Sequence, residues 1–422
     1  MARIKPLQAI YYSRKRIPSL AEVVAPPYDV IDEQARERLA DRSPYNIVAI
    51  DLPRTPPDPY AAAAQLFATW LRDGVLERDR QEALWAYEQE FLGPDGRWHR
   101  RRGFFAGIQL EGYGPGRIRP HERTHPGPRQ DRLRLTRATR ANLSPIFALY
   151  SDPEGTVFRP LERLLPELPF AEVQDDEGNY HRLWRTAEPT LIATVLAAFG
   201  QRELLIADGH HRYETSLTYA RESGGLEVEG PHRYCLACLV ALQDPGLAVF
   251  PIHRLVALDP AQARRLEEFL ARKCAVEELP LPQLRDRCAL PGSGFSFGVL
   301  DGSGGPPRWA SWQAGAPLPP TLAERSPAYR ELDTALLEEL VLKGTLGFGQ
   351  DQIERLEHFG YARTVGEAQR LLSSGKYTHA FLLRPTPVAR VAAVAQAGEF
   401  MPQKSTYFYP KLLTGLLINP LW

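Results

Sequence analysis

The 422-residue sequence has only four cysteines, too few for a disulfide framework in a chain of this length. Its longest apolar run, at 235–242, is much shorter than the roughly 20 residues that a membrane-spanning helix needs. The first residues, MARIKPLQAI, lack the apolar region of a secretory signal peptide. These absences predict a cytoplasmic protein that does not associate with a membrane.

Three common functional motifs are also missing or incomplete. The sequence contains neither the G-x-x-x-x-G-K-[ST] motif of P-loop proteins nor the G-x-G-x-x-G motif of dinucleotide-binding folds. A G-x-S-x-G pattern at 294–298 lacks the helix that follows the nucleophile of α/β-hydrolases. None of these three classes is therefore indicated.

Lysine is scarce, with seven residues against forty-four arginines, and the formal net charge is zero. A neutral chain is not a general binder of polyanions. The charge is uneven, however, because residues 97–140 contain twelve arginines and only three acidic residues. This stretch is either a solvated arginine-rich surface or a wall that faces phosphate groups.

Strand and helix patterns alternate along the chain, which predicts a mixed α/β or α+β protein. The early part predicts a strand at 46–53, a helix at 58–74 capped by Asp58, and a β-hairpin at 84–112. The hairpin is expected to turn at Gly93-Pro94-Asp95-Gly96.

Further along, a charged loop is expected to lead into a helix over 131–142. We expect four consecutive parts, which are an N-terminal α/β part (1–150), a part with the motif described next (151–258), a small helix-plus-strands layer (259–330) and a C-terminal part (331–422).

The stretch ELLIADGHHRYETSLTYA, at 203–220, combines a short apolar strand with a helix. Tyr213, Leu217 and Ala220 fall on one helical face, so ADGHHR lies where the strand becomes a helix N-terminus. Unpaired backbone N–H groups and the helix dipole favour an anion there. Gly209 permits a tight turn and the close approach of a ligand.

The polar residues of this turn are candidates for chemistry. His210, His211 and Arg212 offer hydrogen-bond donors that suit phosphate oxygens. Asp208 either caps the helix, or binds a metal, or accepts a proton from a substrate hydroxyl. A helix cap with merely structural histidines is the alternative to anion binding.

A second polar cluster lies in the proline-bounded loop PHERT. Glu122 is a candidate general base or metal ligand, and Arg123, Thr124 and the later Arg132 are candidate phosphate contacts. An ordinary salt-bridged loop is the alternative.

Three other places carry polar residues in unusual settings. His253 and Arg254 lie within a strand-like run, where a buried arginine needs a partner. Lys404, Ser405 and Lys411 lie in MPQKSTYFYPK, where a lysine kept among many arginines suits a compact charge at a phosphate. Asp29 follows Pro26-Pro27-Tyr28 and is a candidate helix cap or a candidate catalytic carboxylate.

Five stretches together resemble one protein family. They are ADGHHR (207–212), APPYDVI (25–31), PHERTHPGPRQDR (120–132), DPGLAVFPIHRLV (244–256) and MPQKSTYFYPK (401–411). On these the chain is identified as a member of the domain-of-unknown-function family numbered 1015, which has no assigned role.

The turn at 208–212 also resembles, more distantly, the phosphate-binding turn of the ParB N-terminal and sulfiredoxin superfamily, which includes free-serine kinases. This resemblance implies a phosphate-binding core of that type with additional α+β layers. It further implies that the turn holds nucleotide phosphates and that a carboxylate serves as base for the substrate hydroxyl.

The leading hypothesis is a phosphotransferase that moves a phosphoryl group from ATP, ADP or pyrophosphate, with Mg²⁺, to a small hydroxyl substrate such as free serine. Asp208, Glu122 and His210 are its predicted catalytic residues. Its predicted phosphate-binding residues are Gly209, His211, Arg212, Arg123, Thr124, His253, Arg254, Lys404, Ser405 and Lys411.

Two alternatives stay open at this point. The first is a ParB-like nucleotide-binding regulatory or DNA-associated protein, which the arginine-rich stretch favours and the zero net charge disfavours. The second is a metal-dependent hydrolase using Asp208, His210, His211 and His253, although adjacent helical histidines diverge by ~100°. The sequence leaves the oligomeric state open.

Overall fold

The computed structural model describes residues 2–93, 95–115, 117–124, 126–200, 202–313 and 318–422. The chain divides into two compact units, each described here by itself. Unit 1 comprises residues 1–92, 98–247 and 410–422, and unit 2 comprises 93–97 and 248–409. Residues 410–422, which were expected to belong to the C-terminal part, are therefore part of unit 1. The predicted division into four parts otherwise stays a prediction.

A mixed β-sheet organises unit 1. In the described part of the chain, nine strands join it in the order β6-β11-β8-β12-β5-β4-β10-β9, with β1 paired to β5. The pairs β11–β6 and β12–β8 are parallel and the other pairs are antiparallel. These strands are β1 (Ile4–Lys5), β4 (Leu84–Leu92), β5 (Trp98–Gln109), β6 (Ile118–Arg119), β8 (Ile146–Tyr150), β9 (Ala171–Gln174), β10 (Tyr180–Thr186), β11 (Leu204–Asp208) and β12 (Tyr234–Ala241).

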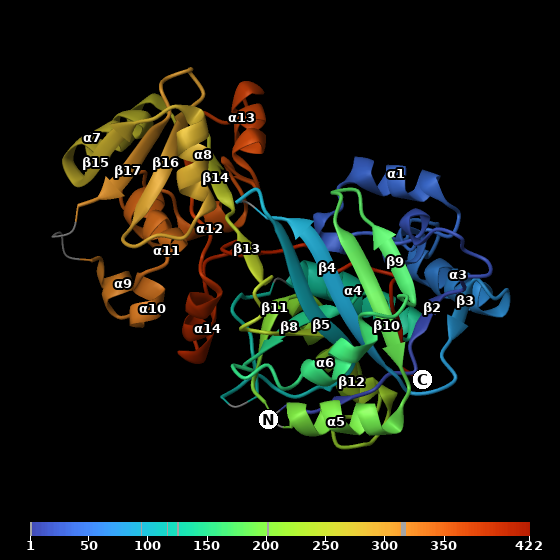
Figure 1. The fold of residues 1–422 in the computed structure, drawn as a ribbon. Helices are drawn as coiled ribbons and strands as arrows, with labels where there is room; N and C mark the ends of the chain where they lie inside the picture. The colour runs from blue at the N-terminus through green and yellow to red at the C-terminus, as the bar shows by residue number, and fades with distance from the viewer. Residues whose placement is uncertain (1, 94, 116, 125, 201, 314–317) are drawn as a thin grey trace. The chain divides into compact units, whose positions relative to one another are not determined.

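Helices and short strands complete unit 1 (Figure 1). The helices are α1 (Glu33–Arg42), α2 (Val48–Asp51), α3 (Pro59–Arg72), α4 (Pro126–Thr139), α5 (Pro189–Phe199) and α6 (His210–Glu222), and the short strands are β2 (Ile10–Tyr12), β3 (Leu76–Arg78), β7 (Ala141–Asn142) and β21 (Asn419–Pro420). Helices α5 and α6 share a hydrophobic core with the sheet. Helices α2, α3 and α4 contribute to a second core. The predicted mixed α/β class is confirmed.

Several predicted elements are confirmed. Strands β4 and β5 form the expected antiparallel hairpin, although Pro94 of its predicted turn lies outside the described residues. Helix α3 occupies the helix predicted at 58–74, and Asp58 Oδ1 caps it by accepting N–H groups of Tyr60 and Ala61 at 3.0 and 3.1 Å. In α6, the predicted face of Tyr213, Leu217 and Ala220 lies in the core.

One predicted element is wrong, and one predicted helix is present but starts earlier. The apolar run predicted as a strand at 46–53 forms the short helix α2, which Asn46 begins by accepting the N–H of Val48 at 3.1 Å. Such short buried runs have no period that separates helix from strand. Helix α4 starts at Pro126, five residues before the predicted start, because prolines fit the first turn of a helix, where N–H groups have no partner.

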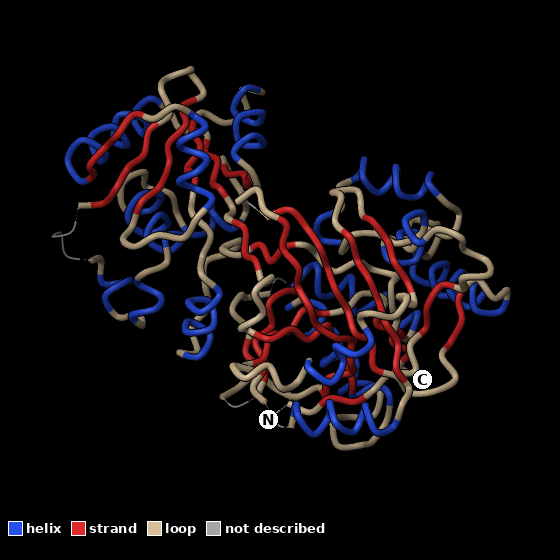
Figure 2. The backbone as a smooth tube through the Cα atoms, viewed as in Figure 1, coloured by secondary structure: helices blue, strands red, loops and turns tan. Residues whose placement is uncertain are grey.

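An antiparallel sheet organises unit 2, with six strands among the described residues in the order β15-β17-β16-β19-β14-β18. Figure 2 shows helices beside its strands, and α8 and α13 share its core. The strands of unit 2 are β13 (Ala248–Phe250), β14 (His253–Val256), β15 (Cys274–Glu278), β16 (Ser296–Asp301), β17 (Arg308–Trp312), β18 (Phe359–Ala362), β19 (His379–Leu382) and β20 (Tyr407–Tyr409). Its helices are α7 (Pro260–Lys273), α8 (Leu281–Ala289), α9 (Pro320–Ala323), α10 (Pro327–Arg330), α11 (Asp333–Leu336), α12 (Gln350–Glu354), α13 (Val365–Ser373) and α14 (Val388–Gln396).

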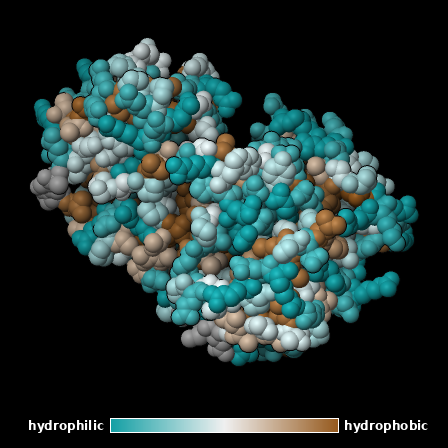
Figure 3. All heavy atoms as spheres, viewed as in Figure 1, coloured by the Kyte–Doolittle hydropathy of each residue, from teal (hydrophilic) through white to brown (hydrophobic). Residues whose placement is uncertain are grey.

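The face drawn in Figure 3 is mostly hydrophilic, and its hydrophobic side chains form small separate groups. No helix in the described ranges is both long and apolar enough to cross a bilayer.

A buried ion pair in unit 2 gives a test of stability. Asp333 accepts hydrogen bonds from Arg384 Nε and Nη2 at 2.9 and 3.0 Å, and both side chains are about nine-tenths buried. Replacing Asp333 by Ala leaves the guanidinium buried without its carboxylate, so we expect a loss of about 3–5 kcal/mol in unfolding free energy. Denaturant unfolding of the full chain measures it.

The pair of Arg390 and Glu331, 3.1 Å apart, supplies the control, because the Glu331 side chain is 65% exposed. Glu331→Ala should change the unfolding free energy by about 1 kcal/mol or less, because exposed pairs contribute little. Equal losses in the two variants would contradict the assignment of the Asp333 pair as a stabilising contact.

Candidate functional site

The candidate site is built around the turn between β11 and α6. Strand β11 ends at Asp208, Gly209 adopts a left-handed conformation with φ 93°, and α6 begins at His210. The pairing of β11 with β8 shifts between Ile206 and Asp208. Such a bulge re-aims the side chain that follows it, here that of Asp208.

Glycine is required at position 209 for two reasons. A positive φ is unfavourable for residues with a Cβ atom. A Cβ built there would also lie 3.1 Å from Cζ and Nε of Arg212, which is closer than most real Cβ contacts. The Arg212 guanidinium therefore packs against the backbone of Gly209, three residues earlier in the chain.

Asp208 is held between two cations. Lys411 Nζ donates to its Oδ1, and Arg212 Nη2 donates to its Oδ2 at 2.5 Å. Burial by itself raises the pKa of Asp208, but the charges of Lys411 and Arg212 outweigh that effect and hold the pKa well below its usual range. Asp208 is therefore ionised at neutral pH.

Arg212 is buried and spans several segments of unit 1. Besides Asp208, its Nη1 donates to Ser144 Oγ at 2.9 Å and to the carbonyl of Pro145. The guanidinium thus fixes the turn to the segment that enters β8, and acts as a positioning group in this arrangement.

Lys411 reaches Asp208 because its own backbone is anchored. Arg101, which is fully buried, donates to the carbonyl of Pro410 at 2.6 Å and stacks on Phe147. Gln89 Nε2 donates to the carbonyl of Lys411 at 3.2 Å. Two side chains of the central sheet therefore place a lysine that lies 203 residues beyond Asp208.

His210 is buried and contacts the loop that follows β6. Its Nε2 accepts the backbone N–H of His121 at 3.3 Å, and His121 Nδ1 donates to the carbonyl of Ile206 at 2.8 Å. Burial, and then the neighbouring His121, lower the pKa of His210 well below its ordinary value. The ring is therefore neutral, with its proton on Nδ1.

The predicted loop residues Glu122, Arg123 and Thr124 lie beside α6. The Thr124 hydroxyl donates to Glu214 at 2.6 Å, and the His121 contact fixes the other end of the loop. Glu122 is half-buried and Arg123 is exposed between these two points. The loop therefore carries one carboxylate and one guanidinium along the first turns of α6.

A second set of polar residues lies behind Arg212. Arg132 Nη1 donates to Asp51 Oδ1 at 2.9 Å, and the Arg132 guanidinium stacks on the Tyr28 ring. Asp29 and Asp51 both act electrostatically on Arg212. Asp51 was not among the residues predicted from the sequence, because nothing in the run NIVAID indicates that its carboxylate is buried next to the site.

Four other predicted residues belong to unit 2. His253 is buried, its Nδ1 accepts the N–H of Leu383 at 3.1 Å, and burial lowers its pKa to about 3. Arg254 donates to the carbonyls of Ile252, Lys404 and Gln403. Ser405 Oγ donates to the carbonyl of Pro402, and Lys404 is exposed. The roles predicted for these residues stay predictions.

At least half of the twelve arginines in the stretch 97–140 pair with carboxylates from other segments of unit 1. Six of its arginines form such ion pairs, namely Arg100 with Glu88 and Glu90, Arg102 with Glu88, Arg119 with Glu203, Arg129 with Glu214, Arg132 with Asp51 and Arg137 with Glu222. Paired guanidiniums offer less charge to nucleic acid than the sequence count suggests.

Among the residues that the structure describes, no group of three or more histidine, cysteine, aspartate or glutamate side chains could hold a metal ion.

The fold and the turn define a mixed α/β protein with a glycine turn at a helix N-terminus and a carboxylate clamped by two cations. The chain belongs to the family described as "Protein of unknown function (DUF1015)", which matches residues 4–335. The family predicted from the five sequence stretches is therefore confirmed. A search of curated proteins found no match.

Several solved structures are distantly similar. A conserved hypothetical protein from Pyrococcus furiosus is 12% identical, with 72% of this chain and 95% of that one covered and a TM-score of 0.33. A free serine kinase variant in complex with ADP is 11% identical, with 72% and 92% covered and a TM-score of 0.36. SbnI with a C-terminal truncation, from Staphylococcus aureus, is 11% identical, with 74% and 87% covered and a TM-score of 0.36.

The glycine turn gives a second prediction. Gly209→Ala combines an unfavourable φ with a clash against the Arg212 guanidinium. We expect Gly209→Ala to lower the unfolding free energy by about 1–3 kcal/mol more than the same change at a glycine where only the positive φ disfavours alanine. Denaturant unfolding of both variants measures the difference.

Gly74 is the matched control, because its φ of 70° is also positive and a Cβ there would meet nothing within 4 Å. Equal losses in Gly74→Ala and Gly209→Ala would show that the contact with Arg212 adds no constraint.

The clamp on Asp208 predicts a pH dependence. Because folding lowers the pKa of Asp208, its ion pairs stabilise the fold above about pH 4, the ordinary value of an aspartate. Their contribution decreases as the pH falls below that value. We expect Asp208→Asn to cost about 3 kcal/mol at neutral pH, and the gap to wild type to narrow steadily in unfolding measurements toward pH 3.

Asp176 supplies the comparison, since its side chain is 64% exposed and pairs with Arg42 at 2.9 Å. Asp176→Asn should have a small effect at every pH. A gap between wild type and Asp208→Asn that does not change with pH would contradict an ionised, clamped Asp208.

Proposed function

We propose that this protein is a phosphotransferase that binds a phosphate donor at the N-terminus of α6 and transfers one phosphoryl group to a hydroxyl of a small molecule. The observation that supports it most is the Gly209 turn, where an ionised Asp208 holds Lys411 beside a helix N-terminus. Phosphoryl transfer depends on positioning and charge neutralisation, which such an arrangement supplies.

The donor would bind to backbone N–H groups of the first turn of α6, with His211 and Lys411 beside them. Both side chains are half-buried and reach solvent, whereas His210 and Arg212 are buried. We therefore assign contact with the donor to the turn, His211 and Lys411, and the positioning of the turn to His210 and Arg212. A lysine at this place would neutralise charge that develops on the transferring phosphoryl group.

Glu122 is the preferred proton acceptor in this proposal. In the transfer, the substrate hydroxyl oxygen forms a bond to phosphorus, the bond from phosphorus to the donor oxygen breaks, and the hydroxyl proton passes to a carboxylate. Asp208 is a weak base because its pKa is lowered by Lys411 and Arg212 despite its burial. Glu122 lies in the loop that is fixed to α6 by His121 and Thr124.

Magnesium enters the proposal together with the donor phosphates, which is how proteins usually bind this ion. Both Asp208 oxygens already accept hydrogen bonds from cations, so this carboxylate does not fit Mg²⁺ well as an added ligand. Glu122 is the remaining predicted carboxylate of the site. The ion would supply additional charge neutralisation at the phosphates.

The donor and acceptor follow from the resemblance of the 208–212 turn to that of free-serine kinases. We propose ATP, ADP or pyrophosphate as the donor and a free hydroxy amino acid such as serine as the acceptor. The ion pairs of the arginine-rich stretch give no support to a DNA-associated role, and no observation on the described residues favours a metal-dependent hydrolase.

An assay of the purified full chain tests the proposal. The protein is incubated with each of the three donors, Mg²⁺ and a panel of hydroxy amino acids, and phosphorylated products are detected by ³¹P NMR. We expect Lys411→Ala to lower kcat by about 10²–10³-fold, the usual effect of removing a group that stabilises transition-state charge.

Lys15→Ala is the matched control, because Lys15 is an exposed lysine of the same unit and should be replaceable without effect. The absence of any phosphorylated product across all donors and acceptors, with folded protein, would refute the proposal. So would a Lys411→Ala variant with the activity of wild type.

A further inference from the structure

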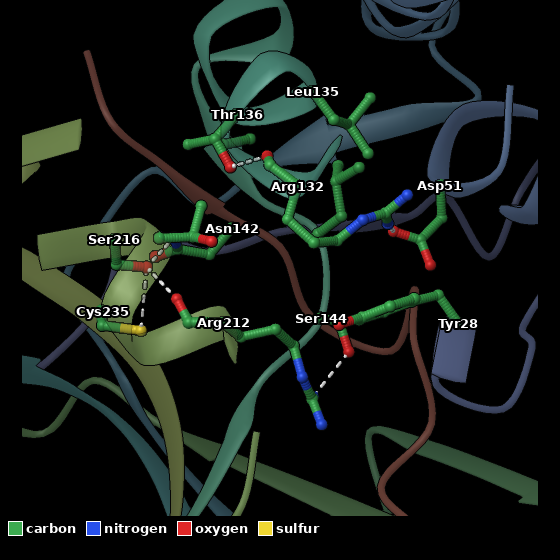
Figure 4. Close-up of a pocket in the computed structure, with 13 residues that line it drawn as sticks. Tyr28, Asp51, Arg132, Leu135, Thr136, Asn142, Ser144, Arg212, Ser216 and Cys235 are labelled. Atoms are coloured by element: carbon green, nitrogen blue, oxygen red, sulfur yellow. Dashed lines mark hydrogen bonds and ion pairs between the residues drawn. The ribbon is translucent and has the colours of Figure 1, made fainter. Parts of the chain in front are cut away.

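A small cavity lies beside Arg212, between α4 and α6 (Figure 4). Its volume is about 40 Å³, and its polar lining includes Tyr28, Asp51, Arg132, Ser144 and Arg212. The side chains of Asp51 and Tyr28 come from one side and those of Ser216 and Asn142 from the other. The proposed function assigns no role to this cavity.

Asp51 carries an oxygen that lacks a hydrogen-bond donor. Its Oδ1 accepts from Arg132, whereas its Oδ2 is buried and has no partner among the residues that the structure describes. The whole residue is only 4% exposed. A buried carboxylate oxygen without a donor is costly, so the cavity calls for a ligand or solvent group that donates to it.

The Tyr28 hydroxyl is a second group available to a ligand. Within the described ranges, this hydroxyl has no hydrogen-bond partner, although the ring is held against Arg132. Burial, and then the charge of Asp29, raise the pKa of Tyr28 to about 12, so the hydroxyl keeps its proton and can donate or accept.

The charges around the cavity favour a cation over an anion. The three cations Arg132, Arg212 and Lys411 are matched by the three carboxylates of Asp51, Asp131 and Asp208 that they contact. Asp29 acts on both Arg212 and Asp51 and adds one further negative charge. Burial raises the pKa of Asp51, and a cation beside its Oδ2 would lower that pKa again and keep the carboxylate ionised. An ammonium group placed in the cavity would therefore balance the group, whatever charge the rest of the ligand carries outside it.

Size and position limit the ligand further. By the usual requirement of 10–15 Å³ for each water, a cavity of about 40 Å³ takes roughly three water molecules, which excludes a nucleotide but suits the head of a small amine. The Arg212 guanidinium borders the cavity and also binds Asp208 at 2.5 Å. A ligand there would thus lie one side chain away from the Gly209 turn.

We propose that this cavity binds the ammonium group of a small amino alcohol or hydroxy amino acid, with Asp51 Oδ2 as the acceptor and the Tyr28 hydroxyl bonded to a neighbouring polar group of the ligand. The identification of this ligand as the phosphoryl acceptor rests on the proposed function. The binding itself does not, because it depends only on Asp51, Tyr28 and the charges around them.

Isothermal titration calorimetry of the full chain tests the inference without any phosphate donor. Ethanolamine and L-serine each carry an ammonium and a hydroxyl, whereas glycolate carries a hydroxyl and a carboxylate but no ammonium. We expect ethanolamine and L-serine to bind and glycolate not to bind. Asp51→Asn should weaken the binding about 10-fold or more, as the loss of a charge-assisted hydrogen bond predicts.

Two further variants keep the test specific. Tyr28→Phe removes a hydroxyl that bonds to no described residue, so the fold should be unchanged while ethanolamine binds about 2- to 10-fold more weakly. Asp79→Asn is the control, because Asp79 is also buried but both of its oxygens pair with Arg185, at 2.6 and 2.7 Å, outside the cavity. It should bind ethanolamine as wild type does.

Three results would overturn the inference. If neither amine binds, the cavity holds water only. If glycolate binds as tightly as ethanolamine, an ammonium group is not what is recognised. If Asp79→Asn loses as much affinity as Asp51→Asn, the loss is a general effect of disturbing the fold. Because no donor is present, a failure of phosphoryl transfer would leave the binding result unchanged, and the reverse also holds.

Discussion

The ionised carboxylate of Asp208, clamped by Lys411 and Arg212, is the contact on which the rest of the site depends. It joins the end of β11, the first turn of α6 and the segment that follows unit 2 in the chain. Each cation is itself fixed, Lys411 through the carbonyls that Arg101 and Gln89 bind and Arg212 through Ser144 and Pro145. The side chain of Asp208 is 17% exposed, and its two charged partners offset the loss of hydration of the rest of the carboxylate.

Ion pairs also surround the turn at greater distances. Behind Arg212, Asp51 and Arg132 repeat the pairing, and at the surface the arginines of residues 97–140 meet carboxylates from other segments. At least half of the arginines in this basic stretch thus have a carboxylate partner within unit 1. Two groups beside Arg212 differ from this pattern, since one oxygen of Asp51 and the hydroxyl of Tyr28 lack partners among the described residues.

Local features of the site could be predicted from the sequence, and its long-range contacts could not. The order of strand, glycine and helix around residue 209 follows from the apolar run, the glycine and the spacing of Tyr213, Leu217 and Ala220. The family likewise followed from short stretches in order. The partnership of residues 208 and 411 has no local signal, because hydrogen bonds between distant segments leave no periodicity. The run before Asp51 was expected to be a strand because a short buried apolar run has no period that separates a helix from a strand.

The return of residues 410–422 to unit 1 has a consequence for how the protein is made. The ribosome delivers Asp208 well before Lys411, which lies 203 positions later in the chain, a difference of about 10–40 s of synthesis at ordinary translation speeds. During that interval the nascent chain presents a half-formed turn whose carboxylate has only one of its two cations. Residues 410–422 therefore complete unit 1 only after residues 248–409, the main part of unit 2, have been translated.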